Sequence, residues 1–155
     1  MSESCHLLIF TLDDQRYALH LSAVDRTARM VEITPVPKAP GIVLGVITVQ
    51  GRIVPVLNIR RRFGLTERKP GLGDHLIIAR TAKRTVALAV DGVHDVIERP
   101  AGEIIPPSAI VPGMEQVEGV VKLEDGLVFI HDLGGFLSLD EEQALEAAIE
   151  QNRHA

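Results

Sequence analysis

The stretch that decides the fold is GVITVQGRIVPVLNIR, residues 45–60. Two runs rich in Val and Ile flank the dipeptide Gln50-Gly51, and β-branched residues favour strands over helices. The pattern predicts strands at 43–49 and 53–57 that pair as a hairpin around this dipeptide. Because Pro55 has no N–H to donate to a neighbouring strand, its position in the second run indicates a sheet edge or a bulge.

A second hairpin of the same design lies near the C-terminus. Residues 117–123 and 127–131 are apolar runs that flank Glu124-Asp125-Gly126, the strongest hairpin signal in the chain. The segment 127–133 also parallels the segment 53–59 in its order of apolar and polar residues. The two hairpins are therefore candidates for copies of one unit.

An internal repeat links the two halves of the chain. Residues 6–24 align without a gap with residues 75–93, at an offset of 69 positions (75 − 6). The identical pairs are His6/His75, Leu7/Leu76, Ile9/Ile78, Ala18/Ala87, Leu19/Leu88 and Val24/Val93. Two copies are too few for a solenoid, so with about five strands each they predict two small, similar β-barrels. Chance similarity between strand-rich segments is the alternative.

Other segments complete the expected organisation. Further strands are predicted at 7–12, 17–21, 30–34, 76–79, 86–90 and 93–97. Proline-rich loops are expected at 34–41 and 100–112, and the glycine-rich segment 63–73 is the candidate junction between the halves. Ser138 and Glu141 fit a capping box at the start of a C-terminal helix.

The 155 residues are enough for one ordinary domain. We expect a mostly β protein with a single domain at 4–140. Its approximate subdomains are 7–66 and 74–137, either separate or with strands exchanged between them. A short helix or tail follows at 141–155.

Composition narrows the classes of partner. The formal net charge is −5 and aromatic residues make up only 3% of the chain, so binding to nucleic acid is not expected. The basic run Arg60-Arg61-Arg62 is interpreted either as a solvated patch or as a patch that docks an acidic partner surface. Cys5 is the only cysteine, no signal peptide opens the chain, and no apolar run approaches the roughly 18 residues of a bilayer span. We expect a cytoplasmic protein without direct membrane insertion.

The sequence predicts neither catalysis nor a cofactor. No histidine lies in a metal-binding motif, no serine lies in a nucleophile elbow, and no glycine-rich phosphate loop is present. We therefore expect no enzyme activity, no catalytic residues, no cofactor and no metal site. A β-barrel that binds a small molecule is an alternative, although no cluster of convergent polar residues supports it.

The hairpin at 45–60 resembles the signature of CheW-type chemotaxis coupling proteins, which runs approximately G-V-I-N-L-R-G-x-V-V-P-V-I-D-L-R. Similar short motifs of that family occur at Tyr17-Ala18-Leu19, Ile33-Thr34-Pro35-Val36-Pro37, Val90-Asp91-Gly92-Val93 and Leu123-Glu124-Asp125-Gly126. The resemblance covers about residues 7–137. It implies two five-stranded, SH3-like β-barrels packed over a shared apolar core.

The resemblance also implies a function and partners. Family members are non-enzymatic scaffolds that bind the regulatory domain of the chemotaxis histidine kinase and the cytoplasmic tip of methyl-accepting chemoreceptors. Such a protein is cytoplasmic and associates with membrane-bound receptor arrays. A free-standing CheW-like regulatory module of an auxiliary signalling system is the alternative.

Six residues are implied as protein-binding by this resemblance: Val24, Arg26, Gly51, Arg60, Val90 and Val93. Val24 falls in the receptor-facing segment, and Val90 and Val93 line the second barrel near the groove between the barrels. Plain core packing is the alternative for each valine. Arg60 supports the receptor-facing region, and an internal salt bridge is its alternative. Gly51 holds a turn that needs an unusual backbone angle.

Three positions depart from the family pattern. Asn58 replaces the usual Asp, Gln50 replaces the common Arg before the glycine of the turn, and Arg26 stands where members often carry an acidic residue. Charge changes at the rim of an interface mainly alter partner choice and association rate. The departures indicate a distinct receptor set or an auxiliary signalling array.

Overall fold

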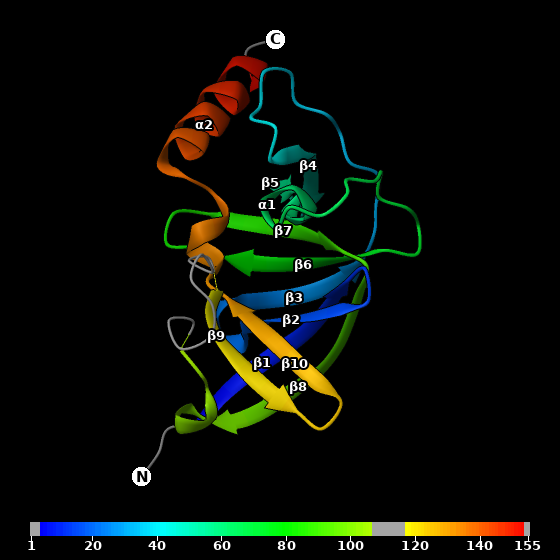
Figure 1. Ribbon diagram of the computed structural model, residues 1–155. Helices are drawn as coiled ribbons and strands as arrows, with labels where there is room; N and C mark the ends of the chain where they lie inside the picture. The colour runs from blue at the N-terminus through cyan, green and yellow to red at the C-terminus, as the bar shows by residue number, and fades with distance from the viewer. Residues whose placement is uncertain (1–3, 107–116, 154–155) are drawn as a thin grey trace.

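Ten strands form two five-stranded sheets in the computed structural model, which describes residues 4–106 and 117–153 (Figure 1). The first sheet has the order β8-β1-β2-β10-β9. Its strands are β1 (Ser4–Leu12), β2 (Gln15–His20), β8 (Gly92–Pro100), β9 (Val117–Leu123) and β10 (Gly126–His131). The second sheet has the order β3-β6-β7-β5-β4. Its strands are β3 (Val24–Arg29), β4 (Val43–Val49), β5 (Arg52–Leu57), β6 (His75–Arg80) and β7 (Thr85–Val90).

The two sheets are copies of one arrangement, which confirms the internal repeat. A shift of five strands, from β1 to β6 and so on, converts the order of one sheet into the order of the other. The register agrees, since Leu7 pairs with His20 and its equivalent Leu76 pairs with Ala89. Each sheet takes strands from both halves of the sequence. The chain crosses to the second sheet at the 3-10 turn η1 (Leu21–Ala23) and returns after β7.

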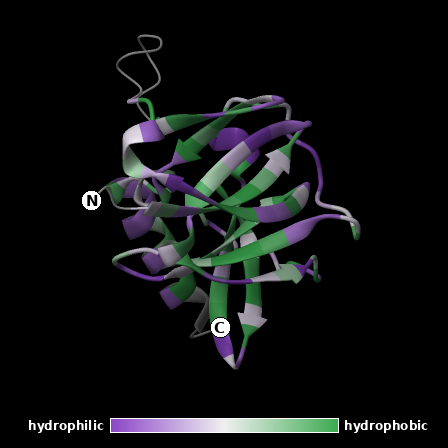
Figure 2. Ribbon diagram, turned by 90° about the horizontal axis from the view of Figure 1, so that it is seen from below, coloured by the Kyte–Doolittle hydropathy of each residue, from purple (hydrophilic) through white to green (hydrophobic). Residues whose placement is uncertain are grey.

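Alternating side chains of the central strands enter different cores. In β1, Leu7 and Ile9 belong to the core of the first sheet, whereas Leu8 and Phe10 belong to a central core between the sheets. Strand β6 repeats this pattern at the offset of 69. A strand that is covered on both faces needs an unbroken apolar sequence. Figure 2 shows these hydrophobic stretches in green along the strands.

The segment before each Gly-led hairpin passes close to that hairpin. Thr34 forms an isolated bridge with Val46, and Ile105 forms one with Val120. A Cβ atom on Gly45 would lie 2.4 Å from the carbonyl oxygen of Thr34, and the φ of Gly45 is +155°. Glycine is therefore required for the close approach, which covers part of strands β4 and β9 at the sheet edges.

Besides η1 after β2, helices and 3-10 turns follow three more strands. Helix α1 (Ile59–Arg62) follows β5, η2 (Ala101–Glu103) follows β8, and η4 (Leu133–Phe136) follows β10. Within the described ranges, no helix is both long and apolar enough to cross a membrane.

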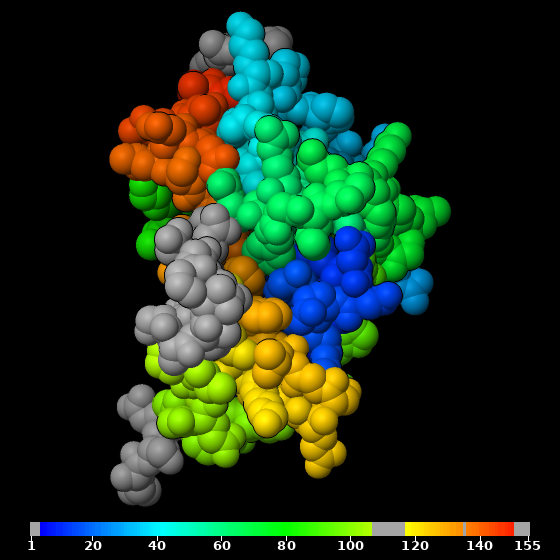
Figure 3. Space-filling view, viewed as in Figure 1, coloured from blue at the N-terminus to red at the C-terminus, as the bar shows by residue number. Residues whose placement is uncertain are grey.

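Helix α2 (Leu139–Arg153) begins with the predicted capping box. The N–H of Glu141 donates to Oγ of Ser138 at 3.1 Å, and the N–H of Ser138 donates to Oε1 of Glu141 at 2.9 Å. Leu145 and Ala148 of the helix are buried. The surface of α2, orange to red in Figure 3, adjoins the segment 34–42.

One predicted strand is wrong. The segment 30–34 forms no strand, and the strand of this region is β3, which the sequence does not reveal. Five of the six residues of β3 are exposed, so it lacks the apolar alternation of a half-buried strand. Met30 is instead a buried residue just after β3, and its N–H donates to the carbonyl oxygen of Asp74 at 3.1 Å.

The edge interpretation of Pro55 is also wrong. Strand β5 lies between β4 and β7, but its ladder with β7 begins only at Val56. The missing N–H of Pro55 therefore falls before that ladder. A register shift does occur nearby, between Val43 and Gly45 of β4.

Among the described ladders, strands β8 and β9 form the edges of the first sheet, and β3 and β4 form the edges of the second. The architecture is thus two open five-stranded sheets rather than ladders closed into rings. The last part of the predicted loop at 100–112, residues 107–112, lies outside the described residues, and its first part belongs to β8 and η2.

The close approach at Gly45 predicts a large effect of a single methyl group. Gly45→Ala should lower the free energy of unfolding by about 2 kcal/mol, because the new Cβ overlaps backbone and the φ is unfavourable. Gly73→Ala is the matched control, since a Cβ there meets no atom within 4 Å. Urea unfolding followed by circular dichroism measures both, and equal stability of the two variants would contradict the proposed overlap.

Candidate functional site

A buried arginine lies where the two sheets meet. Arg60 is 6% exposed, and its Nη2 donates to Oδ1 of Asp13 and to Oδ2 of Asp91, both at 2.7 Å. Its Nη1 donates to the carbonyl oxygen of Thr66 at 3.0 Å. Asp13 lies in the β1–β2 turn of the first sheet, and Asp91 lies where the chain returns to that sheet from β7. The guanidinium therefore links helix α1 of one sheet to the turns of the other.

Arg68 extends this network toward β6. Its Nη2 donates to Oδ1 of Asp91 at 2.6 Å and to Oδ1 of Asp74 at 2.7 Å. Asp74 also accepts the N–H of Gly71 at 2.7 Å. We call the five side chains of Asp13, Arg60, Arg68, Asp74 and Asp91 the junction network.

Two carboxylates of the junction network, Asp74 and Asp91, have a lowered pKa. Burial alone would raise the pKa of Asp91, but hydrogen bonds from Arg60 and from the N–H of Asp13 outweigh it and the pKa is lowered. A hydrogen bond from Arg68 lowers the pKa of Asp74 despite burial. In return, the hydrogen bond to Asp13 raises the pKa of Arg60. Asp74, Asp91 and Arg60 are therefore charged near neutral pH.

The junction network also holds an unfavourable turn. Asp13 and Asp14 have φ values of 50° and 66°, in the left-handed region that non-glycine residues rarely adopt. The N–H of Asp13 donates to Oδ2 of Asp91 at 2.8 Å while its carboxylate accepts from Arg60. These bonds offset the strain of the turn and fix its position against α1.

The run Arg60-Arg61-Arg62 does not form a single solvated patch, because Arg60 is buried and Arg62 is partly buried, whereas Arg61 is exposed. Docking of an acidic partner by this run stays a prediction. Arg60 is buried in the junction network, and the guanidinium of Arg61 lies against Gly41. Arg62 donates to the carbonyl oxygen of Phe136 at 3.2 Å and pairs with Glu141 of α2. Successive residues of a short helix point in different directions, so the run contacts three different elements.

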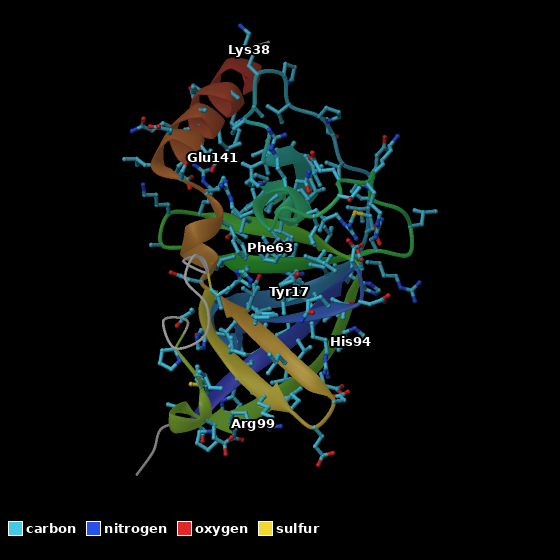
Figure 4. All side chains as sticks on the ribbon, viewed as in Figure 1. Tyr17, Lys38, Phe63, His94, Arg99 and Glu141 are labelled. Carbon is cyan, nitrogen blue, oxygen red and sulfur yellow. The ribbon has the colours of Figure 1, made fainter. Side chains whose placement is uncertain are left out.

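All five Phe and Tyr residues of the chain meet in one cluster beside α1. Figure 4 shows Tyr17 of β2 and Phe63 next to each other, with ring centroids 4.8 Å apart. Phe63 also stacks on His131 of β10 at 4.1 Å and contacts Phe136 at 5.6 Å. The remaining members are Phe10 and Phe129. The cluster joins both sheets by apolar contact where the junction network joins them by charge.

Four of the six predicted binding residues lie in or against the central core. Val90 is 1% exposed and Arg60 is buried, so their side chains act on a partner only through the surface that they support. Val24 and Val93 are partly buried and pack against the central core at the starts of β3 and β8. The internal salt bridge weighed for Arg60 is present, and partner binding by these residues stays a prediction.

The other two predicted residues are exposed. Arg26 lies on β3 and Gly51 in the β4–β5 turn, at opposite edges of the second sheet. Gly51 has a φ of +78° and Gln50 a φ of +50°, which confirms the unusual backbone angle expected of this turn. The structure does not bring Arg26 and Gly51 together.

The departure at position 58 has a local role. Oδ1 of Asn58 accepts the N–H of Arg61 at 3.3 Å as the N-cap of α1, and its Nδ2 donates to Oε1 of Glu67 at 2.7 Å. Asn58 thus makes no ion pair with Arg60, whose carboxylate partners come from elsewhere. Neither Asp13 nor Asp74 lies in a motif that predicts a site, whereas Asp91 lies in the family motif Val90-Asp91-Gly92-Val93.

Two histidines of the described segments, His20 and His94, each face one polar side chain. Nε2 of His20 lies 3.1 Å from Oε1 of Glu118, and Nε2 of His94 lies 3.1 Å from Oγ1 of Thr11. In residues 4–106 and 117–153, no group of three or more His, Cys, Asp or Glu side chains is arranged to hold a metal ion.

The junction network predicts a pH-dependent loss of stability. Asp91→Asn should lower the free energy of unfolding by about 3 kcal/mol at pH 7, because it leaves the buried Arg60 underpaired. The pKa of Asp91 is lowered on folding, so its contribution is present above the unfolded pKa of about 4 and is lost as the pH falls below it. The difference between wild type and variant should therefore shrink in acid.

Asp95→Asn is the matched control, since Asp95 is exposed on the neighbouring strand β8. Urea unfolding between pH 3 and 7, at conditions set about one unit apart, measures both variants. Equal losses for the two variants at pH 7 would show that the junction network does not hold the sheets together.

Comparison with known proteins agrees with this architecture. A family model described as a CheW-like domain matches residues 6–142. Chemotaxis protein CheW of Rhizobium meliloti is 29% identical over 140 residues, which cover 89% of this chain and 90% of that protein. Chemotaxis protein CheW of Thermotoga maritima is 28% identical over 127 residues, which cover 82% and 83%.

A solved structure also superposes on the chain. The crystal structure of the scaffolding protein TtCheW from Thermoanaerobacter tengcongensis matches with a TM-score of 0.80 at 28% sequence identity. The match covers 91% of this chain and 96% of that one. With a family model that spans both sheets and relatives matched over most of their length, this chain belongs to the CheW-like domain family.

Proposed function

We propose that this chain is a non-enzymatic scaffold that couples chemoreceptors to a chemotaxis histidine kinase. The observation that carries the proposal is the family match over residues 6–142, together with the likeness to a protein described as a scaffolding protein. The partners are the regulatory domain of the kinase and the cytoplasmic tip of a methyl-accepting receptor. The protein acts in the cytoplasm, beside membrane-bound receptor arrays.

The receptor-facing surface is proposed at the starts of β3 and β8. Val24 and Val93 are equivalent positions of the repeat, and both continue the central core toward the molecular surface. Arg26 follows on β3, with 41% of its side chain exposed and Asp25 3.7 Å away. Apolar residues beside an exposed arginine are typical of contact surfaces between proteins. The buried side chains of Arg60 and Val90 support this surface from the protein interior.

The shape of the sheets fits the same proposal. Register shifts occur in four of the antiparallel ladders, which bends each sheet strongly. We propose that each sheet forms a barrel-like unit and that the two units present the groove between them to partners. Arg26, Gln50 and Asn58 depart from the usual family residues, which favours a distinct receptor set or an auxiliary array.

Binding to the kinase tests the proposal most simply. The regulatory domain of a chemotaxis histidine kinase from the same organism should bind this chain with one-to-one stoichiometry in isothermal titration calorimetry. Asp95→Asn, which leaves the junction network intact, serves as a folded control. Failure of every such domain to bind would leave the fold in place and exclude kinase coupling.

The charge at Arg26 gives a second test. Arg26→Glu should change the affinity for a receptor tip by about two- to tenfold and alter its salt dependence, because a rim charge acts on association. Arg29→Glu is the matched control, since it reverses an exposed arginine on the other face of the same strand. Surface plasmon resonance at two salt concentrations measures both. Unchanged binding by Arg26→Glu would argue against a receptor set selected through this residue.

A further inference from the structure

The two repeats differ at one equivalent site. At one of the two places, the turn Asp13-Asp14 and Asp91 surround Arg60. The offset of 69 relates Asp13 to Ala82 (13 + 69) in the β6–β7 turn, and relates Ser22 to Asp91 (22 + 69).

The hairpin register supplies the third equivalence. Val49 pairs with Arg52 in one hairpin, and Leu123 pairs with Gly126 in the other, an offset of 74 (123 − 49). Arg60 therefore corresponds to Gly134 (60 + 74). The buried arginine and its two carboxylate partners are replaced on the other side of the molecule by glycine, alanine and serine.

A cleft occupies the place of the missing arginine. Its volume is about 420 Å³, and Gly134, Ala82 and Ser22 all line it. Leu19 and Leu133 provide an apolar wall, and both belong to the central core. Small residues at the three equivalent positions therefore leave a cleft where the junction network holds the guanidinium of Arg60.

The polar residues of the cleft favour a cation. Glu118 and Asp132 bring two carboxylates to its lining, against one arginine, Arg80. Oε1 of Glu118 lies 3.1 Å from Nε2 of His20, and Oδ1 of Asp132 accepts the N–H of Gly134 at 3.0 Å. Among Glu118, Asp132 and Arg80, the carboxylates exceed the guanidinium by one charge (2 − 1). A planar, charged donor with several N–H groups is the side chain that suits such acceptors.

We propose that this cleft receives an arginine side chain from a partner protein. The incoming guanidinium occupies the position that Arg60 occupies in the other repeat, and it bonds to Glu118 and Asp132. The apolar walls pack against its methylene chain, as buried arginine stems pack elsewhere. The site lies beside η1 and η4.

The cleft can be filled from within by substitution. A Cβ atom on Gly134 would meet nothing closer than Oδ1 of Asp132 at 3.5 Å, which is ordinary contact, and its φ is not positive. Gly134→Arg therefore gives the second repeat the residue of the first without a backbone clash. Gly73→Arg is the matched control, because a Cβ there meets no atom within 4 Å and Gly73 does not line the cleft.

The test uses the full chain and N-acetyl-arginine amide as the probe. In ¹H–¹⁵N spectra, the amide signals of Ser22, Ala82 and Gly134 should shift saturably in wild type. N-acetyl-citrulline amide, an uncharged molecule of nearly the same shape, should bind roughly fivefold more weakly, as expected for one partly exposed ion pair. Gly73→Arg should bind as wild type does, and Gly134→Arg should lose the saturable shifts.

Three results would overturn the proposal. They are the absence of saturable shifts in wild type, equal binding of the citrulline compound, and tighter binding of N-acetyl-glutamate amide, which would assign the cleft to an anion at Arg80. The wild-type comparison of arginine with citrulline needs no variant, so it decides the question even if Gly134→Arg does not fold.

Discussion

The pairing of buried Arg60 with Asp13 and Asp91 is the interaction on which the arrangement of the two sheets depends. An arginine that is 6% exposed costs several kcal/mol to remove from water, so it is tolerated only where carboxylates meet it. Asp13 and Asp91 come from two different connections, the β1–β2 turn and the return after β7. The guanidinium therefore fixes the relative position of three chain segments at once. It also makes the unfavourable φ values of the Asp13-Asp14 turn sustainable.

Around this interaction, the same sheet arrangement occurs twice, and three different features lie where the two sheets meet. Charged side chains join the sheets at the junction network, and the aromatic cluster around Tyr17 and Phe63 joins them beside α1. The third place, beside Gly134, holds the cleft. Duplication explains why the same backbone positions recur. The difference between Arg60 and Gly134 explains why one side is closed and the other is available to a partner.

The sequence predicted most of the strands because their apolar runs are long and both faces are buried. It also predicted the repeat, whose equal strand orders confirm it. It missed β3, since exposed residues such as Arg26 and Arg29 carry no periodic signal. It did not decide whether strands exchange between halves, because β1 buries the same side chains whichever sheet it joins.

The candidate site was harder to predict than the fold. Arg60 was identified through the family motif. Its partners Asp13 and Asp91 are 47 and 31 residues away in sequence, so no local pattern connects them to it. The run of three arginines illustrates the same limit, since composition indicated a patch whereas the backbone of α1 directs each side chain to a different partner. No cysteine-based, metal-binding or cofactor-binding motif in the sequence favoured a function other than that of a scaffold.

If the chain couples a receptor to a kinase, the phosphorylation rate of the kinase should depend on the chain. Receptor-bearing membranes and the purified kinase would be assayed with and without this chain, before and after addition of a receptor ligand. The rate should respond to the receptor ligand only when the chain is present. A rate that is the same with and without the chain, at every receptor state, would contradict coupling even if the chain binds each partner separately.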